Sequence, residues 1–205
     1  MTPPPPVPHL SYDQLRRHAE AFLTAYHSTQ HIPTPIEQII EFQLHIDIVP
    51  LPGLEEAFEI VGFTASTLDE ISVDKHVYEH QPGRYRFTLA HEVGHVVLHA
   101  DLFKEHRFRG VDEWKRFVRA IPDLDLSRLE WQAHSFAGLV LVPPEALQRE
   151  FRSAARQVKA KSVTKEMDFA KALIVDMAAT RFQVSSDVIE RRLNFDQIRL
   201  TDLWV

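Results

Sequence analysis

The sequence predicts an α+β fold in which most of the chain is helical and one small β-sheet lies beside a central helix. Two observations lead to this prediction. Apolar residues recur at helical spacing over most of the chain, whereas β-type runs are confined to residues 45–77. Proline and glycine separate those runs, which is typical of short strands joined by turns. A further helical segment is expected at the C-terminal end.

The first part of the chain is expected to contain two helices. A helix over residues 11–28 places Leu15, Ala19 and Phe22 on one apolar face, with Ser11 as its N-cap. Pro35 is expected to open the second helix, which continues to Leu44, because proline suits the first turn of a helix.

The sheet is expected to form from three runs, at residues 45–49, 57–65 and 70–77. Gly83 then breaks the chain before an amphipathic helix expected at residues 85–100. The remaining helices are expected at residues 112–120 and 126–141, followed by two or three more over residues 145–194. Pro143 and Pro144 separate the last two of these regions.

Composition and segment character divide the chain into three expected domains. Residues 1–10 hold five of the thirteen prolines and are expected to be a disordered tail. Residues 11–145 form the expected main domain, and residues 146–205 an expected C-terminal helical subdomain. The sequence shows neither a signal peptide nor the ~20 consecutive apolar residues of a membrane span, so we expect a cytoplasmic protein with no membrane partner.

The chain has 12 histidines and no cysteine, with a formal net charge of −6. The lack of cysteine excludes disulfides, thiolate zinc sites, iron–sulfur clusters and a cysteine nucleophile. Any transition-metal site must therefore be built from histidine, aspartate and glutamate.

The segment HEVGH carries the clearest chemical signal in the sequence. His91 and His95 are four residues apart and so lie on one face of the predicted helix, close enough to share a metal ion. Glu92 points about 100° away, where its carboxylate can take a proton from a water activated by zinc. HExxH alone also occurs by chance, but here it interrupts a strongly apolar helix, where two histidines and a glutamate are costly without a role.

The spacing leaves the third metal ligand open. Asp101 stands six residues after His95, where some zinc sites have a histidine, and His99 continues the four-residue series but drifts off the face. A second-layer or core role fits His99 better than coordination. Glu130, at the start of a later apolar helix, is the remaining candidate. His134 lies one turn further on and is expected to hydrogen-bond a ligand histidine.

Three blocks of the sequence resemble the ImmA/IrrE family of zinc metallopeptidases. RYRFTLAHEVGHVVLH at residues 84–99 resembles the family block RFT-LAHELGH-LLH, and EWQAHSFAGLVLVP at residues 130–143 resembles the block that begins with a glutamate and ends in LLMP. FQVSSDVIERRL at residues 182–193 is similar to the family's ending. Residues 1–56 contribute little to the resemblance. His134 departs from the family's usual asparagine at that position, and Asp74 also stands where members often have asparagine.

The resemblance implies a zincin-like fold with a gluzincin-like site in the domain at residues 11–145. It assigns His91, His95 and Glu130 as Zn²⁺ ligands and Glu92 as the catalytic general base. It also implies site-specific cleavage of a helix-turn-helix transcriptional repressor in a stress, phage or defence response. The alternative is a zinc-containing regulator that binds a partner or DNA without proteolysis.

Charge is unevenly distributed along the chain. Residues 35–80 carry ten acidic side chains and one lysine, whereas residues 149–165 carry six basic side chains and one glutamate. Arg152, Arg156 and Lys159 recur at helical spacing and form one cationic face, which suits nucleic acid as an activator or an acidic partner. A solvated helix face is at least as good an interpretation.

Three further features leave alternatives open. Residues 166–193 can form a helix-turn-helix-like pair or simply pack on the main domain. We favour simple packing, because only Arg191 and Arg192 could read bases in the second helix. Residues 101–127 can be a lid or a substrate-reading element. We expect the substrate to add as a strand near residues 70–77. Tyr78, Tyr85 and His134 are candidate oxyanion donors, and the sequence does not predict an oligomeric state.

Overall fold

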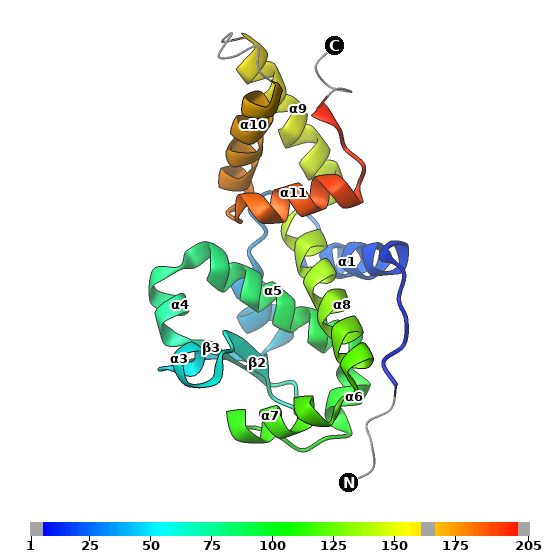
Figure 1. Ribbon diagram of the computed structural model, residues 1–205, viewed down its shortest axis with the longest axis vertical. Helices are drawn as coiled ribbons and strands as arrows, with labels where there is room; N and C mark the ends of the chain where they lie inside the picture. The colour runs from blue at the N-terminus through cyan, green and yellow to red at the C-terminus, as the bar shows by residue number, and fades with distance from the viewer. Residues whose placement is uncertain (1–5, 161–166, 201–205) are drawn as a thin grey trace.

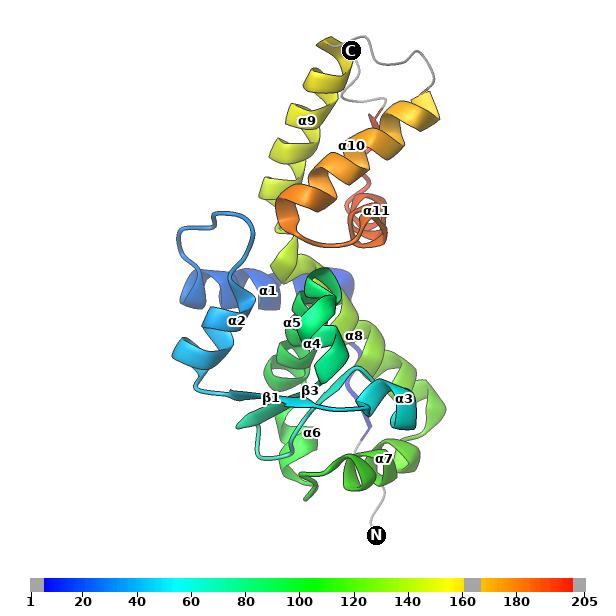
Figure 2. The same cartoon turned by 90° about the vertical axis from the view of Figure 1, so that its left-hand side faces the viewer.

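The computed structural model describes residues 6–160 and 167–200, and in them helices surround one small sheet (Figures 1 and 2). The predicted α+β class is confirmed. In chain order the elements are α1 (Tyr12–Tyr26), α2 (Ile36–Gln38), the π-helix η1 (Ile39–Leu44), β1 (Asp47–Leu51), α3 (Leu54–Phe58), β2 (Gly62–Thr64), β3 (Glu70–Asp74), α4 (Lys75–His80), α5 (Pro82–Leu98), α6 (Ala100–Lys104), α7 (Val111–Ala120), α8 (Asp123–Leu141), α9 (Pro144–Ala160), α10 (Met167–Phe182) and α11 (Ser186–Phe195).

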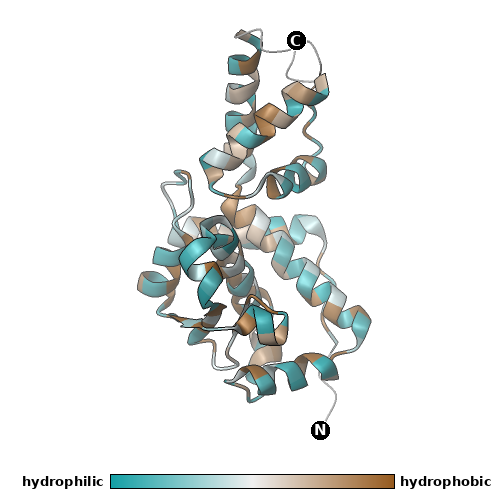
Figure 3. Ribbon diagram, turned by 60° about the vertical axis from the view of Figure 1, so that its left-hand side comes forward, coloured by the Kyte–Doolittle hydropathy of each residue, from teal (hydrophilic) through white to brown (hydrophobic). Residues whose placement is uncertain are grey.

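Helices α5 and α8 form the centre of the molecule and make the most extensive contact between any two elements (Figure 1). Gly94 of α5 lies against Ala133 of α8 so closely that an added Cβ would stand 3.0 Å from the Cα and carbonyl oxygen of Ala133. The glycine of HEVGH therefore lets the two helix backbones approach. Figure 3 shows hydrophilic and hydrophobic residues alternating along most helices, as amphipathic helices require.

The sheet has three strands in the order β1-β3-β2. β1 runs parallel to β3, with Ile48 opposite Ile71, and β2 runs antiparallel to β3, with Phe63 opposite Ser72. The central strand β3 ends at Asp74, whose carboxylate accepts hydrogen bonds from the backbone N–H groups of His76 and Val77 and so caps α4. The sheet thereby leads directly into the helices that carry the HEVGH segment.

Two local predictions were wrong. The run at residues 57–65 begins as the end of α3, because Glu55, Glu56 and Ala57 favour a helix and the backbone N–H of Glu55 donates to the carboxylate of Asp74. Only residues 62–64 of that run form a strand. The run at residues 70–77 is a strand only as far as Asp74, because α4 begins at Lys75. The helix expected from Pro35 to Leu44 is present; it is α-helical over Ile36–Gln38 and continues as the π-helix η1.

The predicted first helix is confirmed. It spans Tyr12–Tyr26, and Ser11 and Gln14 form a capping box, in which the Ser11 side chain accepts from the Gln14 N–H and the Gln14 side chain accepts from the Ser11 N–H. The HEVGH helix begins three residues earlier than expected, because Pro82 occupies its first turn.

The buried apolar residues form two clusters. The larger one runs from α1 through the sheet, α5 and α8 into α9, α10 and α11. The smaller one joins the segment after α5 to the start of α8, and its buried members are Val7, Leu102, Phe103, Phe108, Phe117, Ile121 and Leu129. Val7 is 3% exposed. The described part of the proline-rich tail, residues 6–10, therefore packs on the fold at this point, which differs from the expected disorder; residues 1–5 lie outside the described residues.

The C-terminal helices α9, α10 and α11 gather at the end of the molecule opposite α7 (Figures 1 and 2). Their apolar residues belong to the larger cluster, so no break in the core marks the expected boundary between residues 145 and 146. Arg192 is 3% exposed and donates to the carbonyl of Val142 and the carboxylate of Asp196, so it cannot read bases as the sequence suggested. No helix within the described ranges is long and apolar enough to cross a membrane.

Candidate metal centre

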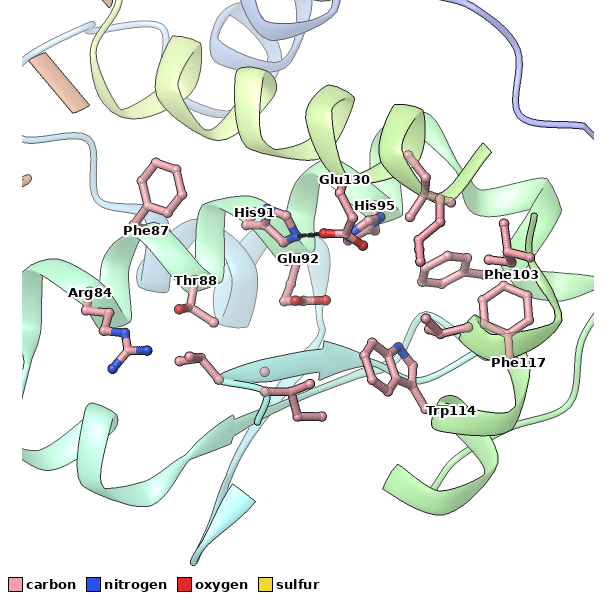
Figure 4. A pocket seen from close by; sticks show the side chains of 17 residues that line it. Arg84, Phe87, Thr88, His91, Glu92, His95, Phe103, Trp114, Phe117 and Glu130 are labelled. Carbon is pink, nitrogen blue, oxygen red and sulfur yellow. Dashed lines mark hydrogen bonds and ion pairs between the residues drawn. The ribbon is translucent and has the colours of Figure 1, made fainter. Parts of the chain in front are cut away.

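The histidines of HEVGH face a glutamate on the later apolar helix. His91 and His95 project from α5, and Glu130 projects from α8 toward both (Figure 4). The Nε2 atoms of the two histidines are 3.0 Å apart. The Glu130 carboxylate oxygens lie 3.2 Å from Nε2 of His91 and 3.7 Å from Nε2 of His95. Among the described residues, these three form the cluster able to hold a metal ion, with ligand atoms within 4.8 Å of one another.

The spacing of these atoms fits one tetrahedral ion. Ligand atoms bound at about 2.0–2.1 Å to a tetrahedral zinc ion are separated by roughly 3.3 Å. The three measured separations of 3.0, 3.2 and 3.7 Å bracket that value. Two imidazoles and one carboxylate also match the donor sets of catalytic zinc sites, which leave the fourth position open.

Glu92 is buried beside this cluster and points toward the sheet rather than toward the three ligand atoms (Figure 4). Thr64, on the edge strand β2, donates a hydrogen bond of 2.8 Å to Oε2 of Glu92. Burial raises the pKa of Glu92 to about 7, against the lowering influence of His91 and of the Thr64 hydroxyl. A carboxylate with this pKa is poised to accept and release a proton near neutral pH.

Burial also controls the protonation of the histidines. It lowers the pKa of His95 well below the usual range, and its neighbours His91 and His99 lower it further. Burial lowers the pKa of His91, but the hydrogen bond that its ring donates to Glu130 and the charges of Glu92 and Glu130 outweigh this effect, so the pKa is raised overall. A neutral His95 offers a free lone pair, which metal coordination requires.

A second layer of hydrogen bonds supports His95. Nδ1 of His99 lies 3.1 Å from Nδ1 of His95, and Nε2 of His99 lies 2.9 Å from Oε1 of Gln132 on α8. His99 is therefore a supporting histidine, as expected from its drift off the ligand face. Asp101 does not belong to the candidate metal cluster.

His134 does not have the role predicted for it. Its Nε2 accepts a hydrogen bond of 2.9 Å from the guanidinium of Arg191, and its ring centre is 6.3 Å from that of His91. The prediction placed His134 correctly on the same side of α8 as Glu130, but the helices of the C-terminal end supply its partner. Gln132, for which the sequence gives no signal, instead hydrogen-bonds His99, the neighbour of His95.

The metal cluster opens into a cleft of about 460 Å³. Figure 4 shows Arg84, Phe87 and Thr88 on one side of the cluster and an aromatic wall on the other. That wall comes from the segment after α5, and its lining residues are Phe103, Trp114, Phe117, Val118, Ile121, Leu126 and Leu129. Residues 101–127, which the sequence left as a lid or a reading element, thus supply most of the apolar residues on this side of the cleft.

The cleft also corrects the expected path of a substrate. β3 pairs with a strand on each side, so residues 70–74 have no free edge to which a substrate strand could add. β1 and β2 are the two edge strands, and of these β2 lies at the cleft, which Ile60, Val61 and Gly62 line. Strand addition is therefore possible along residues 60–64 and not where the sequence placed it.

None of the three candidate oxyanion donors lines the cleft. The Tyr85 hydroxyl donates to Glu37 at 2.8 Å, and the Tyr78 ring packs edge-on against the Tyr85 ring. His134 is engaged by Arg191. These three predictions are therefore not supported by the geometry of the cleft.

A comparison with known protein families gives a match over the segment that contains the candidate metal site. The family model of the M78 peptidases, described as the IrrE N-terminal-like domain, matches residues 76–194, which is more than half of the chain. The chain belongs to the M78 peptidase family. The match includes α5 and α8, and therefore all four proposed site residues, and it extends through α9 and α10 almost to the end of α11.

One solved structure shares the fold of this family member. It is a transcriptional regulator of Mycobacterium tuberculosis, with a TM-score of 0.53 and 17% sequence identity. The alignment covers 88% of this chain and 46% of that one, so the chain spans about half the length of the regulator. No curated protein matches the chain.

Proposed function

We propose that the chain is a zinc-dependent endopeptidase in which His91, His95 and Glu130 bind Zn²⁺ and Glu92 is the general base. The observation that carries this proposal is the convergence of three ligand atoms from α5 and α8 next to a buried carboxylate with a pKa of about 7. Membership of the M78 family supports a peptidase. The absence of cysteine and the two-imidazole, one-carboxylate donor set favour zinc in a catalytic rather than a structural role.

Each side chain of the site has a distinct role in this proposal. The bound metal would supply Lewis-acid catalysis, which polarises the scissile carbonyl and lowers the pKa of the attacking water. Glu92 accepts the proton of that water and later delivers it to the leaving amine. Thr64 holds the Glu92 carboxylate by its 2.8 Å hydrogen bond. The substrate backbone pairs with the edge at residues 60–64, and the aromatic wall receives an apolar side chain.

The proposed substrate is a helix-turn-helix transcriptional repressor, cleaved at one site in a stress, phage or defence response. The three sequence blocks that resemble the ImmA/IrrE family support this substrate class. A cleft of about 460 Å³ with one apolar wall also suits a narrow choice of substrate. Incubating the purified chain and a candidate repressor with Zn²⁺, followed by mass spectrometry of the products, identifies the cleaved bond.

The alternative function is that of a zinc-containing regulator that binds a partner or DNA without proteolysis. Arg152 and Arg156 are exposed on one face of α9, together with Lys159, which is the observation that favours it. The same face can bind nucleic acid as an activator of the peptidase. Adding single-stranded DNA to the cleavage assay separates the two functions, since an activator raises the cleavage rate, whereas a regulator of this kind cleaves nothing.

Replacing Glu92 tests the peptidase directly. Glu92→Gln keeps the size and burial of the side chain but removes the proton acceptor, so we expect zinc to remain bound and cleavage to fall about 10³-fold, which is within the usual contribution of one acid–base group. Zinc stoichiometry by elemental analysis and cleavage rate are the two measurements. Persistent cleavage by the purified variant would contradict the assigned base.

Replacing Glu130 tests the third ligand. Glu130→Ala removes one of three protein ligands, and we expect zinc stoichiometry to drop sharply in the purified variant while the fold is retained, since this side chain is 46% exposed. Glu145→Ala on α9 is the matched control, because Glu145 does not belong to the cluster. Full zinc occupancy in Glu130→Ala would move the third ligand elsewhere.

A further inference from the structure

An unbroken series of hydrogen bonds links the N-terminal segment to the metal cluster. The carbonyl oxygen of Pro8 lies 2.7 Å from Nε2 of Gln132, and Oε1 of Gln132 lies 2.9 Å from Nε2 of His99. Nδ1 of His99 in turn lies 3.1 Å from Nδ1 of His95. Gln132 is 1% exposed, and both histidines are 4% exposed, so water does not compete for the two bonds between these side chains, whereas the bond to the exposed Pro8 is part-buried.

The chemistry of Pro8 decides the direction of every bond in this series. A carbonyl oxygen only accepts, so the Gln132 amide must turn its NH₂ group to Pro8 and its oxygen to His99. That oxygen also only accepts, so His99 must carry its proton on Nε2. Nδ1 of a neutral His99 is then an acceptor, and His95 must donate from Nδ1.

The outcome of the series is a single form of His95. With its proton on Nδ1, His95 has the lone pair on Nε2, the atom that faces His91 and Glu130. This tautomer alone among the neutral forms can bind a metal at that position. An isolated neutral imidazole can carry its proton on either nitrogen. In this protein the choice of nitrogen traces back to the carbonyl oxygen of Pro8.

Packing supports the same link. Val7, the neighbour of Pro8, is 3% exposed and belongs to the smaller apolar cluster together with Phe103. The Phe103 ring stacks on the His95 ring, with centroids 5.4 Å apart and an angle of 22° between the planes. The N-terminal segment thus contributes both to the hydrogen bonds on Nδ1 of His95 and to the apolar cluster that fixes its ring.

We propose that residues 7 and 8 act, through Gln132 and His99, as a positioning device that holds His95 in its metal-binding tautomer. Gln132 and His99 are positioning residues and not catalytic ones, since neither lines the cleft. The inference rests on the proposed function, because it assigns His95 as a metal ligand. It adds that docking of the N-terminal segment sets the metal affinity of the site.

The tautomers can be measured without metal. In the metal-free full chain, long-range ¹H–¹⁵N correlation spectra of the histidine rings should show the proton on Nδ1 in His95 and on Nε2 in His99. A proton on Nε2 of His95 would overturn the inference, whatever the protein does with zinc.

Two variants test the effect on the site. Gln132→Met keeps the volume of the side chain but removes both of its hydrogen bonds, and a chain lacking residues 1–8 removes the Pro8 acceptor and Val7. We expect each to bind zinc about 10- to 100-fold more weakly, measured by competition with a chromophoric chelator. The matched controls are Gln157→Met, at an exposed position on α9, and a chain lacking residues 1–5, and both should keep the affinity of the full chain.

The outcomes separate this inference from the proposed function. If the full chain binds zinc and both variants bind it as tightly, the inference is wrong and the peptidase proposal stands. If the full chain binds no zinc, the metal centre itself is wrong, while the ring spectra still decide the tautomers. Thermal unfolding identifies a shortened chain that has lost its fold, and Gln132→Met then carries the affinity test alone.

Discussion

At the residue scale, the site consists of polar side chains that are buried and paired. Burying an unpaired polar group costs several kcal/mol, so such groups persist where they have partners or a task. His99 and Gln132 satisfy each other, and Glu92 receives the Thr64 hydroxyl. HEVGH indicates the general base and two candidate ligands from sequence, but Thr64 and Gln132 give no signal there, because a threonine or glutamine in an apolar context has many structural uses.

The hydrogen bond between Thr64 and Glu92 leads to a prediction. Thr64→Val keeps the shape of the side chain but removes a donor to a carboxylate, a bond whose loss is worth about 1.5 kcal/mol or more. We expect the pKa of Glu92 to rise above about 7 in the metal-free protein, since the Thr64 bond lowers it. We also expect kcat to fall about tenfold, with KM and zinc stoichiometry unchanged.

Two variants control for this change. Thr64→Ser restores the hydroxyl and should recover most of the activity, whereas Thr67→Val alters an exposed threonine and should have no effect on kcat. Equal activity of Thr64→Val and the unmodified chain would remove Thr64 from the catalytic arrangement.

At the element scale, the site depends on the distance between α5 and α8. Two of the proposed ligands lie on one helix and the third on the other, so a change in helix spacing moves Glu130 relative to the histidines. Gly94 sets this distance by allowing α5 to touch the backbone of Ala133. The glycine of HEVGH therefore has a packing role that is separate from the chemistry of its neighbours.

Gly94→Ala should expose this dependence. Its methyl group would meet backbone atoms of Ala133 at 3.0 Å, which cannot move away without shifting α8. We expect the free energy of unfolding to fall by about 1–3 kcal/mol, and zinc affinity to fall with it. Gly110→Ala is the matched control, because nothing lies within 4 Å of that added Cβ. Urea unfolding and chelator competition measure the two effects, and full zinc affinity in Gly94→Ala would show that the helix spacing tolerates a methyl group.

At the scale of the whole molecule, a buried ion pair joins the C-terminal helices to the rest of the chain. Arg192 and Asp196 of the α11 region pair at 2.8 Å with side chains 3% and 5% exposed, and Asp196 also pairs with Arg16 of α1 at 2.7 Å. Arg192 further donates to the Tyr12 hydroxyl and to the Val142 carbonyl at the end of α8. Residues from both ends of the sequence therefore meet at the end of the helix that carries Glu130.

Removing Asp196 should destabilise the fold strongly. Asp196→Ala leaves Arg192 buried without its carboxylate, which typically costs about 3–5 kcal/mol. Asp187→Ala breaks the exposed pair with Arg191 and should cost less than about 1 kcal/mol. Urea denaturation of both variants gives the comparison, and similar losses from the two would show that burial of the pair is unimportant.

Prediction from sequence succeeded where a pattern is local. Ser11 as an N-cap, the helix around HEVGH and the helix that carries Glu130 follow from helical periodicity and motif spacing. It failed where a distant residue decides the outcome. The backbone N–H of Glu55 in α3 donates to Asp74 at the end of strand β3, and His134 accepts a hydrogen bond from Arg191, fifty-seven positions further on. Local sequence patterns do not predict such partners, because the packing of the elements brings these residues together.

The sequence by itself determined which residues could do chemistry: an HExxH pair at helical spacing, a buried glutamate between them, and no thiols to compete. The tertiary structure decided how those residues are held. Only the packing of α5 on α8 brings Glu130 to the histidines, and only the strand order leaves β2 at the edge of the sheet beside the cleft. Only the docked N-terminal segment orients Gln132 toward His99. The reason is physical: helical spacing is fixed by bonds within one segment, whereas these contacts arise when distant segments bury their apolar faces together.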